Sequence, residues 1–398
     1  MKKLLLAASA CALMAGASMA EDVKIGILIG FTGPIESLTG HMANAAEAAM
    51  AEVNASGKAK NNYIPVRGDD TCTDAAAATA AAERAVTAEG VKGIIGGDCS
   101  GVTRAMLTNV AMPNGIVMVS PSATSPALTT DPDNGLFFRT APSDAREGEV
   151  MADILTEKGI KSIALTYSNS DYGKGLAESI ANAFTAKGGT VTINAAHDDG
   201  KADYSAEVAA LAAAGGDLLV VAGYLDQGGK GIIQASLDSG AFTQFGLPGG
   251  MVGDSLPAAI GPALDGSYGQ VAQSDSPGAA VLQEMGKAND PAFDATSPYT
   301  PESYDAAALI MLAMEASGST DSNVYKEKIM EIANGPADGS GVKILPGELG
   351  KALELIAAGT AIDYDGASGV TLIGPGESAG RYKQFEIKGG KYETVSFR

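Results

Sequence analysis

The stretch GGDCSG, residues 96–101, places a cysteine where a nucleophile could act. Gly97 and Gly101 flank Cys99 with the G-x-nucleophile-x-G spacing that lifts a reactive side chain out of a strand-to-helix turn in α/β-hydrolases. Such a thiol needs a histidine base and an orienting acid. The downstream histidine, His197, lies in NAAHDDG, where an exposed loop residue is the simpler interpretation. Half of a disulfide and a small core residue are the other roles open to Cys99.

The first twenty residues predict export from the cytoplasm. Lys2 and Lys3 precede an apolar run that reaches a small-x-small cleavage site at Ala20, so residues 1–20 have the layout of a Sec signal peptide. We therefore expect a periplasmic protein that is cut after Ala20. A form anchored to lipid through Cys11 is an alternative, although the apolar run before that cysteine is short.

Composition narrows the function classes further. In an oxidising compartment the two later cysteines, Cys72 and Cys99, favour a disulfide over free thiols. The 398 residues carry a net charge of −20, which argues against nucleic acid and anionic membranes, because both are bound by clustered Lys and Arg. The histidines and cysteines lack zinc-site spacing, and no phosphate-binding glycine motif occurs. We expect no metal, no cofactor and a monomer.

Strand-like and helix-like stretches alternate in two blocks, which predicts an α/β protein. The strand-like runs of the first block are residues 23–29, 64–67, 91–97 and 115–120. Those of the second block are residues 162–167, 190–196, 217–223 and 266–273. Short apolar strands between longer helices favour parallel sheets covered on both faces. Two such blocks predict two doubly wound lobes with a ligand cleft between them, which the rest of the chain completes.

This fold gives the polar residues near Cys99 a second interpretation, which is ligand binding. A helix expected just after Ser100 presents free backbone N–H groups that suit a carboxylate. The next strand ends in SPSATSP, where Ser122 and Thr124 offer further donors. Loops that follow neighbouring parallel strands meet at the carboxyl edge of a sheet, where ligands bind. Capping of helices and turns is the alternative role for these hydroxyls.

Seven motifs in order extend this interpretation over nearly the whole chain after residue 20. They are VKIGILIGFTGPIESLTG, DDTCTD, GGDCSG, VSPSATSPALT, SNSDYGKGLAESI, GYLDQGG and IDYDGASG. In this order they resemble the leucine/isoleucine/valine-binding protein family, the type I periplasmic receptors of ABC importers. The resemblance implies a substrate-binding protein without catalytic activity, which closes over a small amino acid and delivers it to a membrane permease.

The resemblance also implies a domain layout. Three hinge crossings join the two lobes of such a receptor, and domain motion closes them on the ligand. The N-terminal lobe is expected to comprise residues 21–140 and 271–362. The C-terminal lobe is expected to comprise residues 141–270 and 363–398.

Individual site residues follow from the same resemblance. The disulfide of the family matches Cys72 and Cys99. The segment that holds the ligand carboxylate matches Ser100 and the loop with Ser122, Ala123 and Thr124. Aromatic residues that close over the ligand from the second lobe match Tyr172 and Tyr224, and one wall of the side-chain pocket falls at Leu38.

One departure affects the expected ligand. The acid that receives the ligand ammonium group in the family should follow the strand at 244–247, where this sequence has Gly249-Gly250. Asp226 or Glu36 could replace it, because an isolated buried ammonium group is costly. Without an acid, an amide, urea or an organic or aromatic carboxylic acid becomes the alternative ligand. A ligand sensor for a signalling partner is the alternative role.

Overall fold

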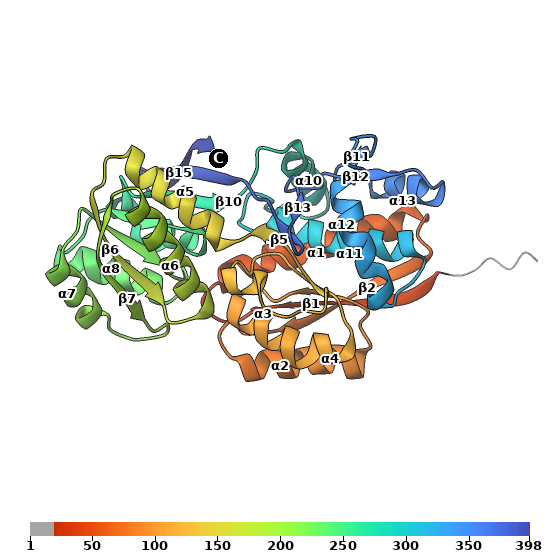
Figure 1. The fold of residues 1–398 in the computed structure, drawn as a ribbon, viewed down its shortest axis with the longest axis horizontal. Helices are drawn as coiled ribbons and strands as arrows, with labels where there is room; N and C mark the ends of the chain where they lie inside the picture. The colour runs from red at the N-terminus through yellow and green to blue at the C-terminus, as the bar shows by residue number, and fades with distance from the viewer. Residues whose placement is uncertain (1–19) are drawn as a thin grey trace, which may run out of the picture.

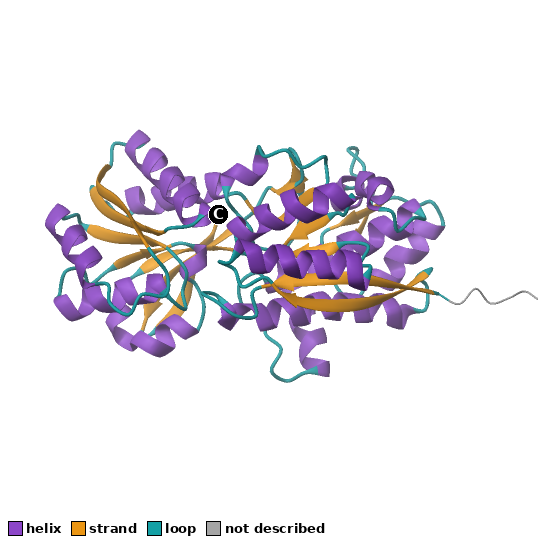
Figure 2. Cartoon of the chain, turned by 90° about the horizontal axis from the view of Figure 1, so that it is seen from below, coloured by secondary structure: helices purple, strands orange, loops and turns teal. Residues whose placement is uncertain are grey.

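The computed structural model describes residues 20–398, so residues 1–19 of the predicted signal peptide, with Cys11, lie outside the described residues. The chain forms two lobes, each an open sheet with helices on both faces (Figures 1 and 2). This arrangement confirms the predicted fold class. Between residues 20 and 398, no helix is both long enough and apolar enough to cross a membrane.

The sheet of the first lobe has seven strands. The five strands from the start of the chain are parallel, in the doubly wound order β2-β1-β3-β4-β5, and β14 extends them next to β5. The strands, in spatial order, are β13 (Leu372–Ile373), β14 (Glu377–Ser378), β5 (Phe137–Pro142), β4 (Met118–Ser120), β3 (Ile94–Gly96), β1 (Glu21–Ile29) and β2 (Asn61–Asp69).

The sheet of the second lobe repeats this order. Five parallel strands, β7-β6-β8-β9-β10, are followed by two antiparallel strands from the C-terminus. The strands, in spatial order, are β16 (Lys391–Phe397), β15 (Tyr382–Lys388), β10 (Tyr268–Ala272), β9 (Phe245–Leu247), β8 (Leu218–Ala222), β6 (Ser162–Ser168) and β7 (Thr190–His197). A separate pair of short strands consists of β11 (Val342–Ile344) and β12 (Ile362–Tyr364).

The helices connect the strands and cover the sheets. In the first part of the chain they are α1 (Glu36–Ser56), α2 (Ala75–Glu83), α3 (Ser100–Met106), α4 (Met112–Asn114), α5 (Asp144–Glu157), α6 (Asp171–Ala186) and α7 (Ser205–Ala214). In the second part they are α8 (Gly228–Ser239), α9 (Ser255–Ile260), α10 (Pro277–Asn289), α11 (Thr300–Ser317), α12 (Ser322–Asn334) and α13 (Leu349–Ala357). Turns of π-helix continue α2 over Arg84–Glu89 and join α3 to α4 over Leu107–Ala111.

The central strands are buried because helices cover both faces of each sheet. All five residues of β8, LLVVA, are buried, as expected for a central parallel strand. Helix α11 is apolar around most of its circumference and packs between α1 and α12, where it is almost entirely buried.

The chain passes between the sheets three times, as the resemblance implies. It leaves the first sheet after β5, which ends at Pro142, and leaves the second after β10, which ends at Ala272. These two crossings lie close to the predicted boundaries after residues 140 and 270. The third crossing lies after β14, between Ser378 and Tyr382.

The position of this third crossing corrects the predicted boundary after residue 362. Strands β13 and β14 pair with β5 in the first sheet, although residues 363–398 were assigned to the C-terminal lobe. Two-residue strands carry no periodicity that could indicate which sheet they join. Glu377 of β14 forms a salt bridge with the fully buried Arg139 of β5, and this ion pair ties the segment to the first lobe.

Candidate ligand-binding site

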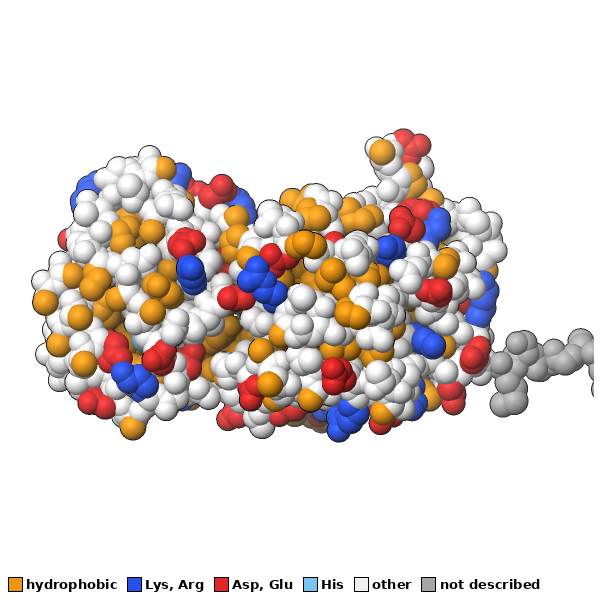
Figure 3. Space-filling model, turned by 60° about the horizontal axis from the view of Figure 1, so that its bottom comes forward, with side chains coloured by type: hydrophobic (Ala, Val, Ile, Leu, Met, Phe, Trp, Pro, Cys, Tyr) orange, Lys and Arg blue, Asp and Glu red, His pale blue; other side chains and the backbone are white. Residues whose placement is uncertain are grey.

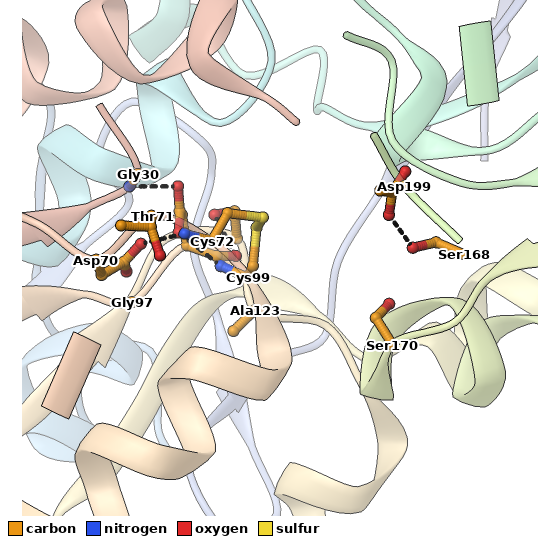
Figure 4. Close-up of a disulfide and its surroundings, with 12 residues drawn as sticks. Gly30, Asp70, Thr71, Cys72, Gly97, Cys99, Ala123, Ser168, Ser170 and Asp199 are labelled. Atoms are coloured by element: carbon orange, nitrogen blue, oxygen red, sulfur yellow. Dashed lines mark hydrogen bonds between the residues drawn. A yellow bond between two sulfur atoms is a disulfide. The ribbon is translucent and has the colours of Figure 1, made fainter. Parts of the chain in front are cut away.

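A disulfide anchors the turn that was first considered as a nucleophile elbow. Cys72 and Cys99 are bonded, with their Cα atoms 5.0 Å apart and both side chains buried (Figure 4). The predicted pairing is confirmed. Because the sulfur of Cys99 is bonded, it is not available as a thiolate nucleophile.

Two buried carboxylates hold the backbone of this turn. Asp98 accepts hydrogen bonds from Gly30 N and Cys99 N, both at 2.8 Å, and Asp70 accepts one from Cys72 N at 2.9 Å (Figure 4). Burial raises the pKa of both carboxyl groups, and the Asp98 charge raises that of Asp70 further. The oxygens of Asp98 are therefore occupied by the fold, although the residue borders the ligand cavity.

The histidine of the hydrolase hypothesis lies elsewhere. His197 ends β7 in the second lobe, is 2% exposed, and has its Nδ1 2.8 Å from the Thr166 hydroxyl. Burial lowers its pKa to about 4. The expectation of an exposed loop histidine was wrong, because the strand continues to this residue and Gly223 and Gly228 lie against its ring.

The hydroxyl groups expected to hold a carboxylate gather where β3 and β4 end. Ser100 begins α3, and its hydroxyl accepts from Ser125 N at 3.0 Å, while Ser122 donates to Asp98 O at 3.0 Å. Ala123 and Thr124 lie in the same buried loop. Neighbouring parallel strands thus bring the predicted segments together.

Arg139 supports this loop from behind and was missed in the sequence. Its side chain is 1% exposed, and Nη1 donates to the carbonyl oxygens of Ala123 at 3.1 Å and Ser125 at 2.9 Å. The other terminal nitrogen of its guanidinium group, Nη2, donates to the Thr129 hydroxyl and to the Glu377 carboxylate. The local sequence FRTAP does not indicate a supporting role for this arginine, because the carbonyl groups that it binds come together only in the folded loop.

The second lobe contributes a pair of aromatic rings. Tyr172 at the start of α6 and Tyr224 after β8 stack with ring centroids 5.1 Å apart and an angle of 26° between planes. The Tyr172 hydroxyl accepts from Gly250 N at 3.0 Å. Both rings are buried.

A cavity lies between these two groups of residues. The volume inside it that a water-sized sphere can reach is only about 20 Å³, well below the usual range for small-ligand sites, so the two lobes must separate to admit a ligand. It is lined by Ile35, Leu38, Asp98, Cys99, Ser100, Ser122, Tyr172, Tyr224, Gly250 and Tyr299. Of the predicted site residues, Ala123, Thr124 and Asp226 are not in this lining.

Tyr299 is a lining residue for which the sequence offered no signal. It lies just before α11 with φ 62°, a left-handed conformation that is uncommon for a tyrosine and that suggests a functional constraint. Its hydroxyl oxygen is 2.8 Å from the point where a Cβ of residue 249 would be.

The tyrosines also explain the two glycines that replace the expected acid. A Cβ at Gly250 would be 2.6 Å from the Tyr172 hydroxyl and 2.6 Å from Gly223 O, which is closer than real Cβ contacts. At Gly249, the Tyr299 hydroxyl lies where a Cβ would need room, 2.8 Å from the Cβ position. Larger residues at 249 and 250 would therefore displace the walls of the cavity.

Asp226, a candidate for the missing acid, instead joins the two lobes. It accepts from Ser37 N at 3.1 Å, from Ser37 Oγ at 2.7 Å and from Ser255 Oγ at 2.6 Å, and its own N–H donates to Pro34 O. Both oxygens are thereby used outside the cavity. Glu36, the other candidate, is exposed.

Two lobes of doubly wound topology, three crossings and a cavity between the lobes define the class of bilobal ligand receptors. Among residues 20–398 no group of His, Cys, Asp and Glu has an arrangement that could hold a metal ion. Acidic and basic side chains are interspersed on the face in Figure 3, where Lys and Arg form no continuous patch.

Comparison with known proteins identifies the family. The chain belongs to the periplasmic binding protein family, whose model matches residues 22–334. The Leu/Ile/Val-binding protein homolog 1 of Brucella melitensis is 31% identical over 313 residues, covering 77% of this chain and 81% of the relative. The Leu/Ile/Val-binding protein of Escherichia coli is 30% identical over 266 residues, covering 66% and 71%. The resemblance inferred from the motifs is confirmed.

Solved structures share the fold at lower identity. The branched-chain amino acid transporter substrate-binding protein LivJ from Streptococcus pneumoniae, solved with isoleucine, matches with a TM-score of 0.76 and 20% identity, covering 94% of this chain and 99% of that one. A solute-binding protein of an ABC transporter from R. palustris, solved with 4-hydroxybenzoate, has a TM-score of 0.77 and 17% identity, covering 95% and 97%.

Proposed function

We propose that this protein is the periplasmic substrate-binding receptor of an ABC importer, and that its ligand is a small neutral amino acid of the branched-chain type. The observation that carries the proposal is the cavity itself, which has hydroxyl groups of Ser100 and Ser122 on one lobe and the stacked Tyr172 and Tyr224 on the other. Family membership supports the receptor role, because proteins of this class bind solutes rather than transform them.

Ligand capture follows from this arrangement. The first lobe receives the carboxylate at Ser100, whose hydroxyl accepts from Ser125 N and keeps its own hydrogen for the ligand, since hydroxyl donors stabilise a negative charge. The tyrosines of the second lobe then cover the ligand and remove its apolar side chain from water. Asp226 hydrogen-bonds to Ser37 across the cleft and stabilises the closed form, which is the form that a permease would recognise.

An aromatic carboxylate is the second candidate ligand. It is favoured by the aromatic lining of Tyr172, Tyr224 and Tyr299, and by the absence of an acid at 249 and 250. The 4-hydroxybenzoate complex of the R. palustris protein shows that this fold accommodates such a ligand.

A thermal-shift screen of amino acids, amides and aromatic or aliphatic carboxylates tests the proposal, because a ligand that binds the native state stabilises it by RT ln(1 + [L]/Kd). A branched-chain amino acid should give the largest shift. No shift with any amino acid, together with a clear shift with benzoates, would replace the first candidate with the second.

A further inference from the structure

Two buried acids near the turn that contains Gly249 and Gly250 are not explained by the fold. Asp144 and Glu147, which we call the acid pair, lie on the first turn of α5, directly after the first hinge crossing. Asp144 is 0% exposed and Glu147 is 2% exposed. Buried carboxylates normally have a cationic partner or a full set of donors, because an unpaired buried charge is costly.

The acid pair has neither. Both carboxylate oxygens of Asp144 lack a hydrogen-bond partner. Glu147 accepts at Oε1 from Gly249 N at 2.7 Å and from Gln270 at 3.2 Å. Burial raises the pKa of Asp144, and the Thr124 hydroxyl and the charge of Arg139 offset this rise only in part. Both terminal nitrogens of Arg139 are engaged by the loop carbonyls, Thr129 and Glu377.

The acid pair also reaches the place where an acid was expected. A Cβ at Gly249 would be 3.4 Å from Oε1 and 3.7 Å from Oε2 of Glu147, and 2.8 Å from the Tyr299 hydroxyl that lines the cavity. Glu147 also accepts from the N–H of Gly249, and Gly250, the next residue, lines the cavity, so this acid lies directly behind the cavity wall. A carboxylate from α5 therefore occupies the neighbourhood that a side chain of residue 249 would enter.

We propose that Glu147, together with Asp144, receives the positively charged amino group of the ligand and makes the site selective for zwitterionic amino acids over carboxylates without an amine. This inference rests on the proposed receptor function and deepens it. The other acids near the cavity are less suitable, because the oxygens of Asp98 and Asp226 are already occupied by hydrogen bonds of the fold.

The test compares one ligand with and without its amino group. Calorimetric titration uses leucine and 4-methylpentanoate, or the amino acid with the largest thermal shift and its deaminated analogue. Glu147→Gln keeps an acceptor for Gly249 N but removes the charge. We expect it to weaken leucine binding by at least about tenfold and 4-methylpentanoate binding by less than about twofold. Glu302→Gln, a buried acid that lines a different cavity, is the matched control and should alter neither affinity.

Equal losses for both ligands in Glu147→Gln would mean a structural role and would overturn the inference. Unchanged leucine affinity would also overturn it. If the wild-type protein prefers 4-methylpentanoate to every amino acid, the inference fails while the receptor function stands. If it binds neither class of ligand, the proposed function itself fails.

A second measurement uses the wild-type protein alone, so the inference can be tested even if Glu147→Gln does not fold. Burial and the neighbouring Glu147 carboxylate raise the pKa of Asp144 well above its ordinary value, which favours the protonated carboxyl group while the site is empty. The other titratable or charged groups around it are Tyr172, Tyr299, Tyr382 and Arg139, and burial raises the pKa values of these tyrosines, so they stay neutral near pH 7. Leucine binding should release a proton, seen as a binding heat that depends on the buffer, and 4-methylpentanoate binding should not. Equal proton release with both ligands would contradict the inference.

Discussion

Replacing Gly250 by alanine tests the physical reason for the missing acid. The new Cβ would lie 2.6 Å from the Tyr172 hydroxyl and 2.6 Å from the Gly223 carbonyl oxygen. The tyrosine side chain can move, but the carbonyl belongs to the backbone after β8, so part of the clash stays. Overpacking of this kind costs about 2 kcal/mol, or about 4–8 °C in Tm for a lobe of this size.

The same substitution should weaken ligand binding. Moving Tyr172 breaks its hydrogen bond with Gly250 N and disturbs its stacking on Tyr224. Together these losses are worth about 1.5–3 kcal/mol, which is about ten- to a hundredfold in Kd. The assay is thermal unfolding of the free protein, followed by calorimetric titration with the best ligand from the screen.

Gly101→Ala is the control for this experiment. Position 101 lies in α3 next to Ser100, and nothing lies within 4 Å of its Cβ position. Alanine there should raise stability by about 0.5–1 kcal/mol, because glycine is unfavourable inside a helix. If Gly250→Ala unfolds and binds like the wild type, close packing of the tyrosine hydroxyls is not the reason for the glycines.

Three further predictions concern the disulfide, the interlobe contact and pH. Reduction, or serine at both Cys72 and Cys99, should lower stability by about 3.5 kcal/mol, because the bond closes a loop spanning 27 residues; thiol titration of the unreduced, unfolded protein should find no reactive thiol from this pair. Asp226→Asn should weaken amino acids and carboxylates by the same factor, because the residue holds the lobes together through Ser37; a loss confined to amino acids would instead place it at the amine. Burial raises the pKa of Glu302 to about 8 from 4.5, so the folded state keeps a proton that the unfolded state loses, and stability should fall between about pH 4.5 and 8. Chemical unfolding of Glu302→Gln across this range should show a smaller fall than the wild type, and parallel curves would contradict the assignment.

The sequence was informative wherever a pattern repeats along the chain. Apolar runs alternating with helices predicted both doubly wound sheets, and the motif around Cys99 predicted the disulfide and the position of Ser100. Residues that act through long-range contacts were not predictable in this way. Arg139 supports the loop through backbone carbonyls, and Glu147 reaches Gly249 only because the first crossing brings α5 beside the turn after β9.

Interpretations of single residues failed where neighbours in space decide the environment. Asp226 stands beside Tyr224 in the sequence, which favoured a place in the cavity, yet its oxygens bond Ser37 and Ser255. His197 precedes two aspartates, which favoured exposure, yet packing of α8 buries it. Local composition cannot distinguish these cases, because the partners come from distant segments.

Calorimetric titration of the wild-type protein and of Ser100→Ala with leucine, isoleucine and valine tests the central claim most directly. The claim predicts binding of one ligand per chain for at least one of them, and a loss of at least about tenfold in Ser100→Ala, whose hydroxyl would no longer bind the carboxylate. No heat of binding with any of the three, or equal affinity in the variant, would contradict it.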